Sequence, residues 1–294
     1  MNNKSIYALG FFDGVHLGHQ ALLTQCCRLA RERNMQTSAI TFQRHPLSAF
    51  TDDPPPLINT TADREVLLRQ YGIANIDSLP VTKDVMSTSW QDFLLHLMEK
   101  GAAGFVCGND FRFGKDGEGD AGKLRTFCQE QNLPWVIVPE QTLDGIRISS
   151  SHIRTLLENG DTETANRFLG HPHILSGTVV PGKQLGRTIG IPTANLLLPK
   201  ELLIPKFGVY ATLVCIDDEK HPAVTNIGTR PTVEGQGITV EPWILDFDAD
   251  LYGKEIQLEF HQFLRPEQKF ENLAELQSEI RKNAAQTRDF FAKT

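Results

Sequence analysis

The sequence has 294 residues, of which 40% are hydrophobic and 22% charged, a composition typical of soluble globular proteins. At about 150 residues per domain, this length allows two domains. Acidic residues outnumber basic ones by 36 to 29, and the net charge of -7 argues against a nucleic-acid-binding surface.

No segment approaches the roughly 18 consecutive apolar residues of a membrane-spanning helix. The N-terminus becomes acidic too early for a signal peptide. Five cysteines without C-x-x-C spacing indicate reduced thiols rather than a disulfide framework. We therefore expect a cytoplasmic protein that binds neither a membrane nor a nucleic acid.

The first half of the chain alternates short apolar runs with helical patterns. We predict strands at 6–10, 37–42, 103–107 and 135–139, and helices at 19–34, 63–72, 121–132 and after the start signal Ser89-Trp-Gln-Asp92. This succession predicts a doubly wound α/β domain with a parallel sheet, whose ligands bind beyond the carboxyl ends of the strands.

The pattern of predicted elements changes after residues 171–173, where runs of apolar and β-branched residues recur at short spacing. We predict strands at 174–180, 208–216, 221–227, 239–247 and 255–263, a number that suits a small antiparallel barrel or sandwich. A terminal helix follows, with an apolar face formed by Leu273, Leu276, Ile280 and Phe290. The predicted domains are residues 1–170 and 171–294.

Two histidines three residues apart begin the first predicted helix. His16 and His19 flank Gly18, at a position where free backbone N–H groups and the helix dipole favour phosphate. Gly18 would let the backbone approach a nucleotide, and the imidazoles would stabilise charge on an α-phosphate. The alternatives are two surface histidines beside a turn or, with less support from the spacing, a zinc site.

A second helix start is rich in hydroxyl groups. Ser149, Ser150 and Ser151 offer caps and donors, and Arg154 adds a guanidinium fork matched to phosphate oxygens. Taken alone, this segment is better explained as a capped helix start. Together with the histidine pair, however, it predicts two helix N-termini that hold a triphosphate between them.

These motifs resemble the nucleotidylyltransferase superfamily, which has a Rossmann-like fold. The strings at 10–20 (GFFDGVHLGHQ) and 108–114 (GNDFRFG) resemble its flavin-adenylylating branch, found in bacterial bifunctional FAD synthetases. The resemblance covers nearly the whole chain. It implies that FMN attacks the α-phosphate of ATP to give FAD and pyrophosphate, with Mg²⁺ as counter-charge.

The same resemblance implies roles for individual residues. His16 and His19 would act on the adenylyl phosphates, and Arg154 would hold the β- and γ-phosphates. The nucleotide would also be bound by Gly10, Phe11, Phe12, Asp13, Gly18, Ser149, Ser150 and Ser151. The flavin side would comprise His45, Asn109, Asp110, Phe111 and Phe113. For 110–114 the alternative is a hairpin-like loop with a packed pair of phenylalanines.

The second half contains no G-x-x-x-x-G-K-[ST] motif, so a Walker-type kinase is not supported. The string at 186–196 (GRTIGIPTANL) instead resembles the riboflavin kinase signature. The resemblance implies nucleotide contacts by Gly186, Thr188, Gly190, Pro192, Thr193 and Asn195, with Thr193 and Asn195 holding Mg²⁺. A tight turn is the alternative for this string.

Phosphorylation of a primary alcohol calls for a carboxylate near the hydroxyl group. Glu241, in TVEPWILDF, resembles the kinase glutamate that serves as base, and Arg230 falls in a matching segment on the flavin side. A solvent-facing glutamate is the alternative. Asp246 and Asp248 are expected to shape the strand end. Departures from the family pattern occur at Phe11, Arg44, Pro242-Trp243 and Asn283.

The leading hypothesis is therefore a bifunctional enzyme that converts riboflavin to FMN and FMN to FAD, using ATP and Mg²⁺. One alternative is a nucleotidylyltransferase with another acceptor, which would have no reason to carry the kinase string. The other is an inactive flavin- or nucleotide-binding regulator. The sequence does not indicate an oligomeric state.

Overall fold

A computed structural model describes residues 4–182, 186, 190–217, 219–232 and 235–293, and leaves the side chains of 230–232 and 235–236 undescribed. The chain divides into two compact units, Met1–Ser150 and Ser151–Thr294. Each unit is described by itself below.

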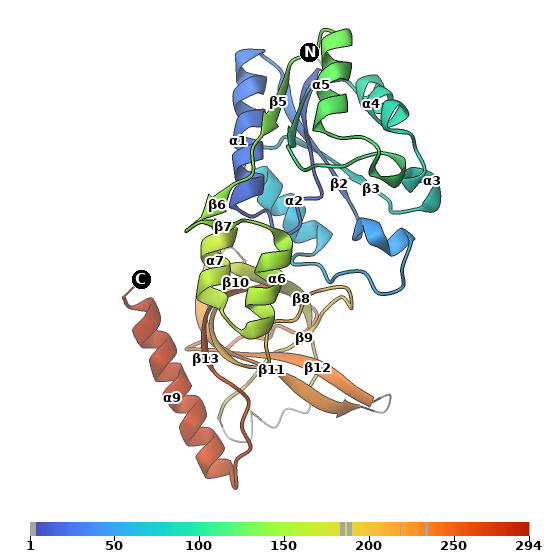
Figure 1. Ribbon diagram of the computed structural model, residues 1–294. Helices are drawn as coiled ribbons and strands as arrows, with labels where there is room; N and C mark the ends of the chain where they lie inside the picture. Colours follow the sequence, from blue (N-terminus) through green and yellow to red (C-terminus); the bar gives the residue numbers. More distant parts are fainter. Residues whose placement is uncertain (1–3, 183–185, 187–189, 218, 233–234, 294) are drawn as a thin grey trace. The chain divides into compact units, whose positions relative to one another are not determined.

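The first unit is built on a parallel sheet (Figure 1). Its strands are β1 (Ser5–Leu9), β2 (Gln36–Phe42), β3 (Asn75–Leu79), β4 (Ala102–Gly108) and β5 (Trp135–Val138), in the order β3-β2-β1-β4-β5. The predicted doubly wound sheet is thereby confirmed. Strand β3 was not predicted, because Asn75 and Asp77 are residue types depleted in strands and the strand is only half-buried at the sheet edge.

Helices cover both faces of this sheet (Figure 1). They are α1 (Leu17–Glu32), α2 (Thr61–Gln70), α3 (Lys83–Met86), α4 (Trp90–Glu99) and α5 (Ala121–Glu130), with 3-10 turns η1 (Pro46–Ala49) and η2 (Lys115–Gly117). Helix α1 packs on one face, where the Cys26 thiol donates to the Ile6 carbonyl. Helices α4 and α5 cover the other face, where Leu94 and Leu124 join Tyr7 in one apolar cluster.

The predicted helix start at Ser89 is confirmed. The hydroxyl of Ser89 accepts the backbone N–H of Asp92 at 3.1 Å and donates to its carboxylate at 2.7 Å. This reciprocal cap satisfies a backbone donor that the first helical turn leaves without an intrahelical partner. A short hairpin, β6 (Thr142–Leu143) with β7 (Ile146–Arg147), ends the unit.

The second unit contains a closed antiparallel barrel. Its strands are β8 (His173–Val180), β9 (Asn195–Leu197), β10 (Gly208–Ile216), β11 (Glu219–Thr232), β12 (Gly235–Ile244) and β13 (Glu255–Arg265), in the order β10-β11-β12-β9-β8-β13. The barrel prediction is confirmed. Strand β9 was not predicted because its three residues are too few to show a period-2 pattern.

Helix α6 (Ser150–Asn159) precedes helix α7 (Thr162–Leu169), which packs against β8 and β13 of this barrel. The backbone N–H of Lys206 donates to Leu157 O at 3.0 Å. The Asn166 amide donates to Phe260 O and accepts the His173 N–H, both at 2.7 Å. The contacts therefore divide the chain after Ser150, whereas the boundary at residue 170 remains a prediction about the catalytic domains.

The terminal helix α9 (Leu273–Phe291) packs through a different set of residues from the predicted one. The predicted Leu273 is 65% exposed, while Leu276, Ile280 and Phe290 are half-buried. The fully covered positions are Asn283, Ala284 and Thr287, whose small side chains let the helix approach the barrel closely. The helix is thus anchored by its second half, where Ala284 meets a cluster of Val209, Val224 and Leu245.

Within the described residues, no helix is both long enough and apolar enough to cross a membrane.

Candidate nucleotide and flavin sites

The two histidines lie at the N-terminus of α1, directly after the carboxyl end of β1. His16 is the helix cap: its Nδ1 accepts the backbone N–H of His19 at 3.3 Å. The two rings stack, with centroids 3.7 Å apart and planes 11° apart. The structure therefore brings the predicted pair together as one unit at a helix end that favours anions.

Burial sets the charge state of this pair. His16 is buried, and the Nδ1 atom of His19 is buried with no hydrogen-bond partner among the described residues. Burial, then the neighbouring His16, then Arg64 hold the pKa of His19 well below its usual value. His19 is accordingly neutral at physiological pH, and its ring can donate one hydrogen bond to a ligand oxygen.

The two glycines of the motif make room for side chains. A Cβ at Gly10 would lie 2.8 Å from the Phe12 ring, and a Cβ at Gly18 would lie 3.2 Å from the His16 ring. Phe12 is fully buried, with its ring edge against His19 at a centroid distance of 5.2 Å. These contacts give Gly10, Gly18 and Phe12 a positioning role for the histidines.

The loop between β1 and α1 is strained. Phe12 and Val15 adopt φ values of 58° and 38°, in the left-handed region that bulky and β-branched residues avoid. Asp13 holds the loop, since its carboxylate accepts the backbone N–H groups of Ile58 at 2.9 Å and Asn59 at 3.4 Å. Strain of this kind is typical of functional sites whose surroundings determine the backbone.

The serine-rich helix start reaches this loop. The hydroxyl of Ser150 donates to the backbone oxygen of Asp13 at 2.9 Å, across 137 positions of the chain. Ser149 precedes it and is half-buried, and Ser151 is exposed. Arg154 is buried on α6 and belongs to the second unit, so its predicted phosphate contact remains a prediction.

The predicted flavin segment divides into an exposed part and a packed part. Asn109 and Asp110 are exposed after β4, and Arg147 forms an ion pair with Asp110. Phe111 and Phe113 stack at a centroid distance of 5.7 Å, within or against the core of the first unit. Phe113 also pairs with Gly119 in an isolated bridge, so here the local structure is the hairpin-like loop of the alternative interpretation.

His45, which follows β2, contacts the loop between β1 and α1 that carries the histidine pair. It caps η1, with Nδ1 accepting the Leu47 N–H at 3.2 Å. Its ring meets the edge of Phe11 at a centroid distance of 5.3 Å, and Phe11 also contacts Phe42. The departure at Phe11 thus joins an aromatic cluster at the carboxyl ends of β1 and β2.

Arg64 belongs to this neighbourhood and was missed in the sequence. Its guanidinium lies 4.7 Å from the Phe11 ring centroid, and the residue is fully buried. The sequence does hold a pattern that indicates its burial, because Arg64 stands three and four residues before Leu67 and Leu68, on the same face of the helix.

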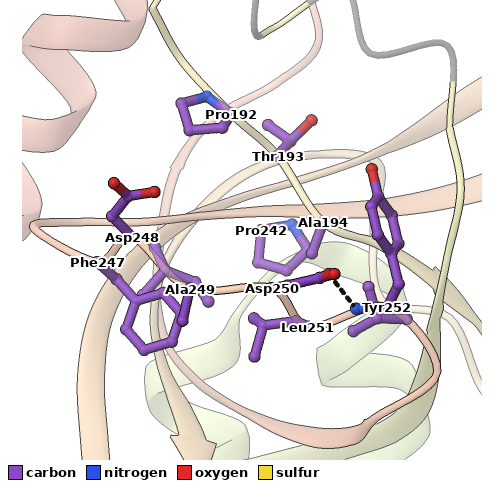
Figure 2. Close-up of a pocket in the computed structure, with 12 residues that line it drawn as sticks. Pro192, Thr193, Ala194, Pro242, Phe247, Asp248, Ala249, Asp250, Leu251 and Tyr252 are labelled. Carbon is purple, nitrogen blue, oxygen red and sulfur yellow. Dashed lines mark hydrogen bonds between the residues drawn. The ribbon is translucent and has the colours of Figure 1, made fainter.

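The second unit has a pocket of about 390 Å³ beside the glycine-rich string (Figure 2). Volumes of this size accommodate small molecules and cofactors. Its lining includes the predicted Pro192 and Thr193. The full lining is Val179, Pro192, Thr193, Ala194, Pro242, Ile244, Phe247, Asp248, Ala249, Asp250, Leu251 and Tyr252.

Half of the pocket lining comes from residues 247–252, which were not predicted as site residues. Asp250 accepts the backbone N–H of Tyr252 at 3.0 Å and so fixes the turn that presents these side chains (Figure 2). Asp248 lies in the lining, and its expected role in shaping the strand end or its turn remains a prediction. The carboxylate of Asp246 accepts a hydrogen bond from Arg288 Nη2 of α9 at 3.0 Å.

The predicted loop residues near the pocket are only partly described. A Cβ at Gly182 would lie within 2.3 Å of the Asn195 amide, and one at Gly186 within 2.1 Å of the Ile191 carbonyl. Gly190 has a φ of 69° and open space around it. Thr188 and the side chain of Arg230 lie outside the described residues.

Glu241 and the pocket belong to opposite faces of β12. Pro242 and Ile244 line the pocket, and because side chains alternate along a strand, Glu241 and Trp243 project from the other face. Trp243 packs there on the apolar cluster that contains Ala284 of α9. Glu241 is half-buried, opposite Asn226 of β11.

Asn283, on the same side of the barrel, replaces the acidic residue expected by resemblance. Its carbonyl oxygen accepts the Nε–H of Arg265 at 3.1 Å, and a carboxylate of Glu279 lies 3.6 Å from the same nitrogen. A neutral amide, rather than a carboxylate, therefore accepts the hydrogen bond of Arg265 at this buried position.

Two protein-family models match the chain in tandem: FAD synthetase over residues 1–152 and riboflavin kinase over residues 169–291. The chain belongs to the bacterial FAD synthetase family. A bifunctional riboflavin kinase/FMN adenylyltransferase of Listeria monocytogenes is 36% identical, over 99% of this chain and 93% of the relative. The Escherichia coli K12 protein of the same name is 36% identical, over 98% and 93%.

The fold of this chain is similar to that of a solved structure. A crystal structure titled as a macrolide-efflux protein from Streptococcus pneumoniae superposes with a TM-score of 0.88 and 31% identity. It covers 97% of this chain and 94% of that one.

Proposed function

We propose that this chain phosphorylates riboflavin to FMN in its second half and adenylylates FMN to FAD in its first half, with ATP as the donor in both steps. The observation that carries the proposal is the tandem match of the two family models, each covering a separate candidate site. One site is the histidine pair on α1, and the other is the pocket beside β12.

In the adenylyltransferase half, a phosphate oxygen of FMN attacks the α-phosphorus of ATP while the bond to pyrophosphate breaks. No covalent enzyme intermediate is needed, so the protein contributes alignment and charge stabilisation. His16, His19 and the α1 N-terminus act on the adenylyl phosphate, and Ser149 to Ser151 with Arg154 act on the pyrophosphate side. Asn109 and Asp110, both exposed, remain proposed flavin contacts, and so do His45, Phe111 and Phe113.

In the kinase half, we assign the pocket to the nucleotide and Glu241 to the base. Glu241 would take the proton of the riboflavin hydroxyl group while the hydroxyl oxygen bonds the γ-phosphorus of ATP. The bond between the γ-phosphorus and ADP would break, and ADP would leave. Because Glu241 and the pocket are on opposite faces of β12, the phosphate chain has to extend from the pocket past Thr193. The catalytic domains are proposed as residues 1–170 and 171–294.

Mg²⁺ is proposed to accompany ATP. The pocket wall offers the hydroxyl of Thr193 and the carboxylates of Asp248 and Asp250, oxygen donors of the kind that this ion prefers. Thr193 and Asn195 would hold the ion, which neutralises charge on the transferred phosphoryl group.

Incubation with riboflavin, ATP and Mg²⁺, followed by chromatography, tests the proposal. Appearance of FMN and then FAD is the expected result. FAD formation from supplied FMN without riboflavin phosphorylation would remove the kinase half of the proposal. Neither product would favour a different acceptor or a binding protein without activity.

A further inference from the structure

Arg64 is a fully buried cation next to the histidine site. It lies in the first turn of α2, where Thr60 caps the helix by accepting the Asp63 N–H at 3.0 Å. Fully buried arginines are rare unless they are paired. Its Nε and Nη2 atoms are buried and have no hydrogen-bond partner among the described residues.

The remaining nitrogen of the guanidinium ties two strand ends together. Nη1 donates to Phe11 O at 3.2 Å, to Thr41 Oγ1 at 3.1 Å and to Phe42 O at 2.8 Å. Thr41 itself donates to Phe11 O at 2.6 Å. These acceptors follow β1 and end β2, at the edge of a parallel sheet where ligands bind.

The carbonyl of Phe11 is the critical acceptor. It belongs to the residue before Phe12, whose left-handed backbone and buried ring support His19. Loss of the Nη1 contact would therefore release the strained loop that places both histidines. The ring of Phe11 adds a cation–π contact with the guanidinium on the other side.

Asp13 and Glu65 act electrostatically on Arg64, but among the described residues its guanidinium donates only to uncharged acceptors. Burial lowers the pKa of Arg64, while Asp13 and Glu65 oppose that effect, yet an arginine stays protonated in proteins. Asp13 is engaged by the N–H groups of Ile58 and Asn59. A buried cation without a hydrogen-bonded carboxylate is costly for folding, and an anion bound nearby would offset part of that cost.

We propose that Arg64 is a positioning residue for adenylyl transfer, which braces the Phe11 carbonyl in the loop that carries the histidine pair and supplies a buried positive charge beside that loop. The inference rests on the proposed function of this half of the chain. Arg64 acts through the loop and through its field, without a contact to the substrate.

The variants Arg64→Met and Arg64→Lys test this assignment, with Arg69→Met as the matched control. Arg69 is on the same helix but exposed, with one bond to Ala74 O at 3.0 Å. Methionine keeps much of the volume and removes the charge and the fork, whereas lysine keeps the charge. Circular dichroism and urea unfolding of the same preparations report whether the first unit is folded, and riboflavin phosphorylation reports on the second half.

For Arg64→Met we expect kcat of FAD formation to fall by about tenfold or more, because small displacements of aligned groups have effects of that size. Riboflavin phosphorylation should not change. Arg64→Lys should recover part of the rate, and Arg69→Met should match the wild type. An unchanged rate of FAD formation in Arg64→Met would overturn the proposal, as would an equal loss in Arg69→Met.

Titration of the His19 ring by NMR separates this role from a purely structural one and needs no activity. The His19 resonance is assigned by its loss in His19→Gln. Arg64 lowers the pKa of His19, after burial and His16, so the His19 pKa should rise in Arg64→Met and stay low in Arg64→Lys. An unchanged His19 titration in Arg64→Met, with equal loss of FAD formation in both variants, would reduce Arg64 to a packing residue. Absence of FAD formation by the wild type would instead contradict the proposed function.

Discussion

The Nδ1 atom of His16 accepts the backbone N–H of His19, while the two imidazole rings stack 3.7 Å apart. One residue thus caps the helix and supports the ring of the other. A cap residue contributes about 1 kcal/mol to stability. We therefore expect His16→Ala to lower the free energy of unfolding by about that amount and to reduce FAD formation strongly.

The control for this prediction is His16→Asn, because asparagine is a good cap without an imidazole ring. It should restore the stability measured by urea unfolding but not the rate of FAD formation. Recovery of both would mean that His16 serves only as a cap.

His19→Ala should abolish FAD formation from FMN and leave riboflavin phosphorylation near the wild-type rate, because the two reactions are assigned to separate halves. Both rates are measured on one preparation by chromatography. Loss of both activities in a folded protein would contradict the assignment.

Gly18→Ala should reduce FAD formation by about tenfold, since the new Cβ would press on the His16 ring at 3.2 Å. Stability should not fall, because alanine is favoured over glycine in a helix by about 1 kcal/mol. A parallel loss of stability and activity would show that the whole loop, rather than the ring, is displaced.

His173 provides a pH test of the barrel. It is fully buried, neither ring nitrogen has a partner among the described residues, and burial, followed by the neighbouring His171, lowers its pKa from 6.5 to about 3. Since the folded pKa is below the unfolded one, this group leaves stability unaffected above pH 6.5. It removes stability progressively as the pH falls from 6.5 towards 3.

His173→Phe should therefore weaken the pH dependence of the barrel unit's free energy of unfolding between pH 6.5 and 4.5. This range is the upper part of the interval in which the wild type loses stability. Urea unfolding midpoints at these two pH values measure the effect. An identical slope in wild type and variant would mean that His173 is protonated in the folded protein.

The kinase half offers a matched pair at Thr193, which lines the pocket. Thr193→Val keeps the shape and removes the hydroxyl, so riboflavin phosphorylation should fall by about tenfold or more and require more Mg²⁺. Thr193→Ser keeps the hydroxyl and most of the rate. Equal rates in Thr193→Val and wild type would remove Thr193 from the proposed Mg²⁺ site.

Glu241→Gln should remove riboflavin phosphorylation while ATP binding, followed by calorimetry, changes little. FAD formation from supplied FMN is the internal control. A rate near wild type would discard Glu241 as the base and leave the solvent-facing alternative.

The sequence predicted what short-range patterns encode. Alternation of strands and helices fixed the parallel sheet, and the spacing of His16 and His19 placed both at one helix start. It could not show that Phe113 packs in a core, because an apolar side chain near a ligand motif has the same pattern as one beneath it. Arg64 and the pocket wall at residues 247–252 are assembled by tertiary contacts between segments distant in the chain.

The contacts of Asn166 cross the predicted boundary between the catalytic domains at residue 170. Its amide joins α7 to Phe260 of β13 and to His173 of β8. A fragment ending at residue 170 would therefore carry α6 and α7 without the strands that cover them, and one beginning at 171 would leave two barrel backbone groups unsatisfied. Separate expression of the halves at that point is expected to yield two aggregation-prone proteins, whereas limited proteolysis of the intact chain should spare residues 151–172.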